Sequence, residues 1–210
     1  MKQIQLTLEQ KDRSVIALSL IIFLLVGLVF FINNREPDVM NYPTNRDSII
    51  VFGDSLAEGI GSSDGTGFVS ELEGLVNRDI EQYGVSGDTT ERALQRLDKV
   101  IDQKPGIVII SLGGNDFIQG VPKDEMRQDY NKIISRLQNG GSIVMILGVP
   151  GYTYSYSGLA RDHKVSYVSN ILRGVITNPD LMSDPIHPND AGYSKIANRI
   201  APELRRLITY

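Results

Sequence analysis

From residue 48 onward, short apolar runs alternate with longer segments in which apolar residues recur every three or four positions. The short runs have the length and composition of buried strands, and they lie at 48–52, 79–83, 107–112, 143–147 and 165–168. The longer segments have the period of amphipathic helices, at 68–76, at 88–101, around Met126 to Leu137 and around Ile196 to Leu204. Asp88 is the predicted N-cap of the helix at 88–101, with Glu91 at the capping-box position. This alternation predicts an α/β domain of three layers, with helices on both faces of a mainly parallel five-stranded sheet.

The first part of the chain has a different pattern. Residues 15–32 form an uncharged apolar run, and 18 residues at ~1.5 Å each cross most of a hydrocarbon core ~30 Å thick. Lys2, Lys11 and Arg13 precede the run, which favours a cytoplasmic N-terminus. We therefore expect a short cytoplasmic stretch at 1–14, a transmembrane signal anchor at 15–32 and a polar linker at 33–46.

The folded domain is expected to span 47–210 and to lie on the periplasmic or extracellular side of the inner or plasma membrane. A cleaved signal peptide is the alternative interpretation of 15–32. The apolar core of such a peptide is usually ~7–15 residues long, and no small-x-small cleavage site follows this run, so an uncleaved anchor is favoured.

The net charge and the amino-acid composition argue against several classes of function. The net charge is −4 and no cluster of Lys and Arg is visible, which argues against a nucleic-acid partner. The chain has no cysteine, which excludes disulfides, thiolate metal ligands and a cysteine nucleophile. It has two histidines, His163 and His187, so a serine that needs an imidazole base has two candidate partners.

Polar motifs follow the predicted strands at the points where those strands end. Gly53-Asp54-Ser55-Leu56 follows the first strand, Gly84 the second and Asn115 the third. Because ligands of open parallel sheets bind beyond the carboxyl ends of the strands, these motifs are expected to converge on one site. The backbone N–H groups of Ser55 and Gly84 and the side-chain amide of Asn115 are suitable donors to a developing oxyanion.

A second motif, at 184–188, places Asp184 three residues before His187 in a turn bounded by prolines. Ser55, His187 and Asp184 supply a nucleophile, its base and the carboxylate that orients the base, which predicts a serine hydrolase. His163 lies in a charged run and is interpreted as a solvated loop residue.

Two further carboxylates, Asp54 and Asp116, are expected to support the turns around the site rather than take part in the chemistry. No cofactor is expected. A metal site built from Asp54, Asn115, Asp184 and His187 is the weaker alternative, because a single histidine without paired carboxylates is a poor metal site.

The chain resembles the SGNH or GDSL hydrolases over about 48–204. Four blocks carry the resemblance, FGDSL at 52–56, YGVSGDTT at 83–90, GGND at 113–116 and DPIHPNDAGY at 184–193. It is most similar to the bacterial thioesterase, arylesterase and lysophospholipase branch. The resemblance implies a flavodoxin-like fold, Ser55 as nucleophile, His187 and Asp184 as its partners, and Ser55, Gly84 and Asn115 as the oxyanion hole. The implied activity is hydrolysis of a carboxylester, thioester or lysophospholipid through an acyl-enzyme.

Tyrosines stand where the sequence departs from many relatives. Tyr83 precedes Gly84, and the segment 150–165, which looks short, contains Tyr152, Tyr154 and Tyr156. We expect these four tyrosines to line the substrate pocket and the site to be open and shallow, with weak discrimination by acyl length.

Other functions fit parts of the pattern. The same fold could remove or transfer O-acetyl groups of envelope glycans. A membrane-tethered binding module without catalysis is an alternative of another class, and a metal-dependent phosphoesterase is a third.

Overall fold

A computed structural model describes residues 15, 18, 21–25 and 38–208, except for the side chains at 153–155. The chain divides into two units, Met1–Pro37 and Asp38–Tyr210. In the part of the chain that is described, no helix has both the length and the apolar character needed to cross a bilayer. The predicted anchor at 15–32 falls largely outside the described residues, as do 1–14 and the start of the linker.

The second unit contains a sheet of five parallel strands in the order β2-β1-β3-β4-β5. The strands are β1 (Ile49–Gly53), β2 (Ile80–Gly84), β3 (Ile107–Ser111), β4 (Ile143–Leu147) and β5 (Ser166–Val168). Each predicted strand is present, within one residue of its expected bounds. The predicted α/β class and the five-stranded parallel sheet are therefore confirmed.

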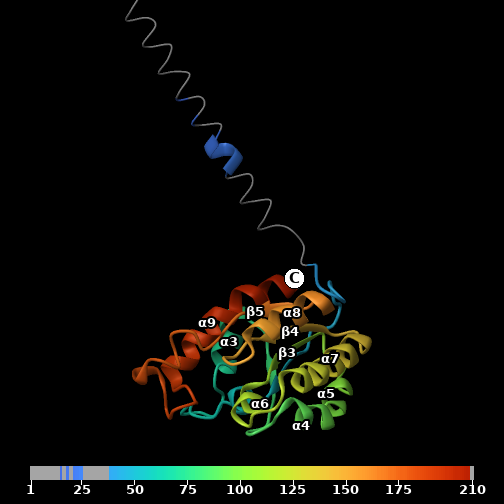
Figure 1. The fold of residues 1–210 in the computed structure, drawn as a ribbon. Helices are drawn as coiled ribbons and strands as arrows, with labels where there is room; N and C mark the ends of the chain where they lie inside the picture. The colour runs from blue at the N-terminus through green and yellow to red at the C-terminus, as the bar shows by residue number, and fades with distance from the viewer. Residues whose placement is uncertain (1–14, 16–17, 19–20, 26–37, 209–210) are drawn as a thin grey trace, which may run out of the picture. The chain divides into compact units, whose positions relative to one another are not determined.

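Helices cover both faces of this sheet (Figure 1). They are α2 (Ser55–Glu58), α3 (Val69–Val76), α4 (Thr90–Gln95), α5 (Asp98–Ile101), α6 (Gly114–Ile118), α7 (Lys123–Asn139), α8 (Thr153–His163) and α9 (Asp190–Leu207), with a 3₁₀ turn, η1 (Pro179–Leu181). The crossover from β1 to β2 runs in one direction along the sheet, and the later crossovers run in the other. Right-handed crossovers then place α3 on one face and α4, α7 and α8 on the other. Helix α9 follows the last strand and packs against α3.

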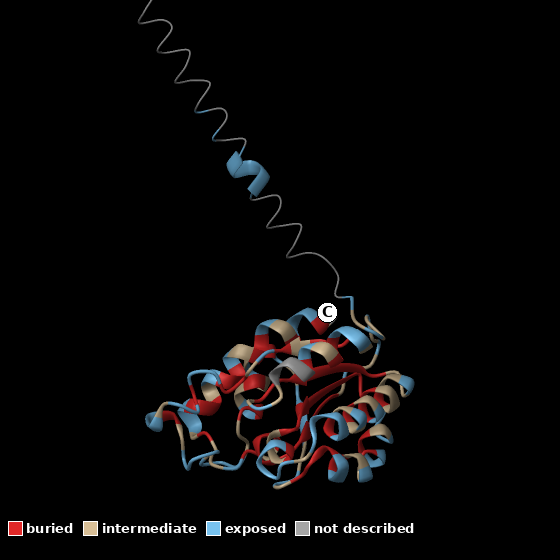
Figure 2. Cartoon of the chain, in the orientation of Figure 1, coloured by how far each residue is buried: buried red, intermediate tan, exposed pale blue. Residues whose placement is uncertain are grey.

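Burial follows the position of each strand in the sheet. Every residue of β1, β3 and β4 is buried, as expected for strands covered on both faces, whereas Glu81 and Gln82 of the edge strand β2 are exposed. Figure 2 shows these buried strands between helices whose outer surfaces are exposed. The central strands therefore appear in the sequence as continuous apolar runs, because helices cover the sheet on both faces.

The helix predicted at 88–101 is the element that the structure corrects. It is divided into α4 and α5, and its N-cap is Thr89, whose Oγ1 accepts a hydrogen bond from the N–H of Arg92. Asp88 does not cap the helix because its carboxylate pairs with the Nε of Arg96 at 2.6 Å. A tertiary ion pair thus replaces the local cap that the sequence indicated.

The loop after β1 is built around a buried aspartate. Asp54 is the N-cap of α2, and its Oδ1 accepts from the N–H of Leu56 at 3.1 Å. The side chain is almost fully buried, and this burial is the main cause that raises the pKa of Asp54 from its ordinary value of 3.8 to about 7. The hydrogen bond from Leu56 opposes the shift, and the negative charge of Asp116 adds to it.

This raised pKa predicts a dependence of stability on pH. The folded protein keeps the Asp54 proton up to a pH of about 7, whereas the unfolded chain releases it near its ordinary value of 3.8. The stability that comes from this protonation is therefore fully present at low pH and is lost as the pH rises toward 7, by an amount on the order of a few kcal/mol. Asp54→Asn cannot ionise, so its free energy of unfolding should fall less between pH 5 and pH 8 than that of the native chain. Urea unfolding at several pH values measures both slopes, and equal slopes would contradict the assignment.

Candidate active site

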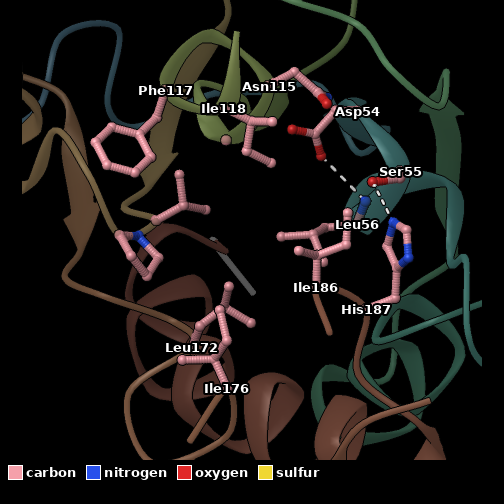
Figure 3. Close-up of a pocket in the computed structure, with 13 residues that line it drawn as sticks. Asp54, Ser55, Leu56, Asn115, Phe117, Ile118, Leu172, Ile176, Ile186 and His187 are labelled. Carbon is pink, nitrogen blue, oxygen red and sulfur yellow. Dashed lines mark hydrogen bonds between the residues drawn. The ribbon is translucent and has the colours of Figure 1, made fainter. Parts of the chain in front are cut away.

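Three side chains from two distant parts of the sequence form a hydrogen-bonded chain at the carboxyl edge of the sheet. Figure 3 shows the contact between Ser55 and His187. Ser55 is the first residue of α2, and its Oγ lies 3.0 Å from Nε2 of His187. Nδ1 of the same imidazole lies 2.6 Å from Oδ2 of Asp184. The structure thus brings together the serine, histidine and aspartate that the motifs had singled out.

The turn that carries His187 is organised by Asp184 itself. Oδ1 of Asp184 accepts from the backbone N–H groups of Ile186 and His187, each at 2.8 Å, while Oδ2 faces the imidazole. The backbone closes behind them, because the N–H of Ser183 donates to the carbonyl of His187 at 2.9 Å. One carboxylate therefore fixes both the backbone and the ring.

The electrostatics of this turn fix the tautomer of the histidine. Partial burial of Asp184 favours its neutral form, but the hydrogen bonds from His187 and from the N–H groups of Ile186 and His187 outweigh it and hold the pKa of Asp184 below its ordinary value. An ionised carboxylate can only accept, so Nδ1 carries a proton and Nε2 is left to accept from the Ser55 hydroxyl. This arrangement is suited to removing a proton from Ser55.

Asn115 lies across the same pocket, near the start of α6. Its Nδ2 donates to the backbone carbonyl of Asp88 at 3.0 Å. An amide nitrogen carries two N–H bonds, so this contact orients the side chain and leaves the second N–H for a ligand. Asn115 is therefore a suitable donor to an oxyanion that forms at Ser55.

The structure does not place Gly84 in the pocket. Gly84 packs against α2 so closely that an added Cβ would lie 2.1 Å from the nitrogen of Glu58, and this contact accounts for the glycine. Gly87, in the same motif, has a φ of +83°, and no atom lies within 4 Å of the place that a Cβ would take. Neither glycine is among the residues that line the pocket, so the role expected for Gly84 stays a prediction.

The pocket beside Ser55 has a volume of 240 Å³, and its walls are mainly apolar. Its lining comprises Asp54, Ser55, Leu56, Gly114, Asn115, Phe117, Ile118, Val149, Pro150, Leu172, Ile176, Ile186 and His187. Figure 3 shows Leu172 and Ile176 on the side of the pocket away from Ser55. A substrate whose reacting carbonyl lay at Ser55 would thus find room for an apolar group.

The tyrosines predicted for this pocket do not line it among the side chains that the structure describes. Tyr156 is fully buried, and its hydroxyl donates to the carbonyl of Leu112. It lies on α8, which forms most of the segment 150–165 and turns this residue toward the core. Tyr152 donates to the carbonyl of Val121 instead. Tyr83 lies near the end of β2 and is not among the lining residues, and the side chain of Tyr154 is not among those described.

The remaining candidates have structural contacts. The carboxylate of Asp116 accepts from the N–H and the hydroxyl of Thr90, which fixes the start of α4, and burial raises the pKa of Asp116. His163 is not a loop residue but ends α8, where its Nε2 lies 2.8 Å from Oδ1 of Asn131. Within the described ranges, no cluster of three His, Cys, Asp or Glu side chains could hold a metal ion.

Comparison with known proteins agrees with this geometry. The chain is 31% identical to an arylesterase of Vibrio mimicus over 176 residues, which cover 75% of this chain and 88% of that protein. It is 27% identical to esterase TesA of Pseudomonas aeruginosa over 179 residues, or 77% of this chain and 89% of the relative. The crystal structure of TesA superimposes with a TM-score of 0.73 at 26% identity, over 77% of this chain and 99% of the other.

A family model covers most of the folded unit. The GDSL-like Lipase/Acylhydrolase family matches residues 51–195, a range that contains Ser55, Asn115, Asp184 and His187. This chain therefore belongs to the GDSL-like lipase and acylhydrolase family and is an esterase or acylhydrolase of that family.

Proposed function

We propose that the protein hydrolyses esters or thioesters of apolar acids through a covalent acyl-enzyme on Ser55. The observation that carries this proposal is the chain of hydrogen bonds from Asp184 through His187 to Ser55, which ends at the mouth of an apolar pocket. A serine hydroxyl becomes an effective nucleophile only beside such an oriented base.

The reaction would proceed in two steps. His187 takes the proton of Ser55 as Oγ attacks the carbonyl carbon, and it then returns that proton to the leaving alcohol or thiol. Water, activated by the same imidazole, releases the acid from Ser55. The negative charge on the carbonyl oxygen would be stabilised by the N–H of Ser55 and the second N–H of Asn115.

The pocket favours an acyl group larger than acetate. The relatives include an arylesterase and a thioesterase 1/protease 1/lysophospholipase L1 of Escherichia coli, the latter 27% identical over 179 residues. An O-acetyl esterase or acetyltransferase of envelope glycans is the second candidate, but an acetyl group would leave most of the apolar wall unfilled. A non-catalytic binding module would have no need of an imidazole aligned on Ser55.

The decisive test is covalent labelling of the serine. Native protein is expected to react with a fluorophosphonate probe and to hydrolyse p-nitrophenyl butyrate, whereas Ser55→Ala should lose labelling and at least a thousandfold of kcat, on the order seen when other triads lose a member. Ser62→Ala, which removes a hydroxyl from a neighbouring loop, is the matched control. Well-folded native protein that neither labels nor turns over would refute the enzyme mechanism and favour a binding role.

The size of the pocket predicts a dependence on acyl length. Each methylene that enters an apolar wall contributes ~0.8 kcal/mol, so kcat/KM should rise by up to about fourfold per added CH₂ until the pocket is full. Ile176→Trp would fill its far side and should move the optimum to shorter p-nitrophenyl esters. Thr177→Trp, at an exposed neighbour outside this pocket, is the control. A profile that does not change with Ile176→Trp would show that the acyl group binds elsewhere.

We also propose that the apolar run at 15–32 anchors the enzyme in a membrane, with the catalytic unit outside the cytoplasm. The length of the run and the basic residues before it support this proposal. The full chain is expected to stay in the membrane fraction after an alkaline carbonate wash, while a chain that begins at Asp38 should be soluble, because Asp38–Tyr210 is a compact unit. Release of the full chain by the wash would contradict an integral anchor.

A further inference from the structure

One arginine outside the pocket ties together the segments that carry the catalytic groups. Arg96 lies at the end of α4 and is only partly exposed. Its three guanidinium nitrogens each have a separate partner, with Nε donating to Oδ2 of Asp88 at 2.6 Å and the other two to the carbonyls of Tyr83 and Gly53 at 2.9 and 2.7 Å. The guanidinium also stacks on the ring of Phe52, 4.5 Å from its centroid.

The hydrogen bonds from Arg96 to the ends of β1 and β2 affect the position of Ser55. Gly53 is the last residue of β1 and stands two positions before the nucleophile, and Tyr83 lies beside Phe52 one step earlier in the β1–β2 pairing. The carbonyl of Gly53 also accepts from the N–H of Val85 at 3.0 Å, where the loop between β2 and α4 begins. Arg96 therefore fixes the backbone from which α2 and Ser55 start.

The contact with Asp88 bears on the opposite side of the site. The carboxylate of Asp88 pairs with Arg96, and its backbone carbonyl accepts from Nδ2 of Asn115 at 3.0 Å. A shift of Asp88 would therefore move the acceptor that orients Asn115. Ser55 follows β1 and Asn115 follows β3. The side chain of Arg96 contacts the backbone that leads to Ser55 and also Asp88, whose carbonyl holds Asn115.

We propose that Arg96 is a positioning residue that sets the distance between Ser55 and Asn115 for the transition state, an inference that rests on the proposed acyl transfer. Arg96 does not line the pocket, so it has no direct contact with a substrate bound there. Its planar guanidinium presents donors in fixed directions to three acceptors, which a lysine ammonium at the end of a flexible chain cannot reproduce. The charge of Arg96 also offsets that of Asp88 in a partly buried place.

If Arg96 had a purely structural role, replacing it would lower the amount of folded enzyme and leave the rate of the chemical step unchanged. The loop has other attachments, since the N–H of Ser86 donates to the carboxylate of Glu58 at 2.5 Å and Thr90 donates to Asp116. These contacts should keep the domain folded when Arg96 is replaced. The loss would then appear in the chemical step rather than in the amount of folded enzyme.

The experiment compares Arg96→Lys and Arg96→Ala with the native full-length chain. Because a displacement near 1 Å can cost about 100-fold in rate, we expect kcat to fall on the order of 10- to 100-fold in Arg96→Ala and less in Arg96→Lys, while KM stays close to the native value. Fluorophosphonate labelling of Ser55 should slow in parallel. Asp88→Asn, which removes the charge of the partner but keeps the backbone carbonyl, should give a smaller loss of the same kind.

A matched arginine at the other end of the sheet controls for general stability. Arg46 is also partly buried and donates to the carbonyls of Pro105 and Gly140, far from Ser55 in the fold. Arg46→Lys should lower the melting temperature without lowering kcat. If Arg96→Lys and Arg46→Lys have the same kcat at equal folded fraction, Arg96 is not a positioning residue.

A double-mutant cycle with Asn115→Ala separates positioning from other effects. Asn115→Ala alone is expected to cost on the order of 10²–10³ in kcat, as for other oxyanion donors. If Arg96 acts through Asn115 and Ser55, adding Arg96→Ala should cost much less in the Asn115→Ala background than in the native one. Full additivity would overturn the proposal. If the native protein labels and turns over but the Arg96 variants are unaffected, this inference alone is refuted. If the native protein does not label, the acyl-enzyme is refuted and this inference with it.

Discussion

The parallel register of the three neighbouring strands β2, β1 and β3 is the constraint on which the site depends. Gly53 of β1 pairs with Gly84 of β2 and with Ser111 of β3, so these strands end at the same level. A side chain on Gly53 would lie 2.1 Å from the carbonyl of Ser111, so only glycine permits this approach. Ser55 and Asn115 then emerge at the point where the strand connections change direction, which is where ligands bind in doubly wound sheets.

The histidine reaches Ser55 by a different route, through a preformed local turn. Asp184 organises this turn with two backbone hydrogen bonds before it orients His187, so the base and its carboxylate form one rigid unit. Docking of α9 against α3 then brings the unit to Ser55, 132 residues away in sequence. The local unit fixes the tautomer, and the packing of the helices fixes the distance.

Buried charge is concentrated around this edge of the sheet. Asp54 and Asp116 are buried and have raised pKa values, while Asp88 is paired with Arg96. A buried carboxylate lowers stability unless hydrogen bonds satisfy it. Each of these three aspartates contacts a backbone or side-chain group in a loop or helix start beside the site. The polar residues of the motifs thus hold the loops that carry Ser55 and Asn115.

The sequence by itself determined the α/β class and the five strands, and it singled out Ser55, His187 and Asp184, which the structure brings into contact. It could do so because strands buried on both faces read as continuous apolar runs, and because a turn such as that at 184–188 is specified by neighbouring residues. Only the tertiary structure decided that Gly84 packs against α2, that Tyr156 belongs to the core, and that Asp88 pairs with Arg96 rather than capping a helix. The first two outcomes depend on contacts between residues remote in sequence, which neither period nor spacing encodes. The third depends on which of two nearby partners the Asp88 carboxylate takes, and the folded loop decides this.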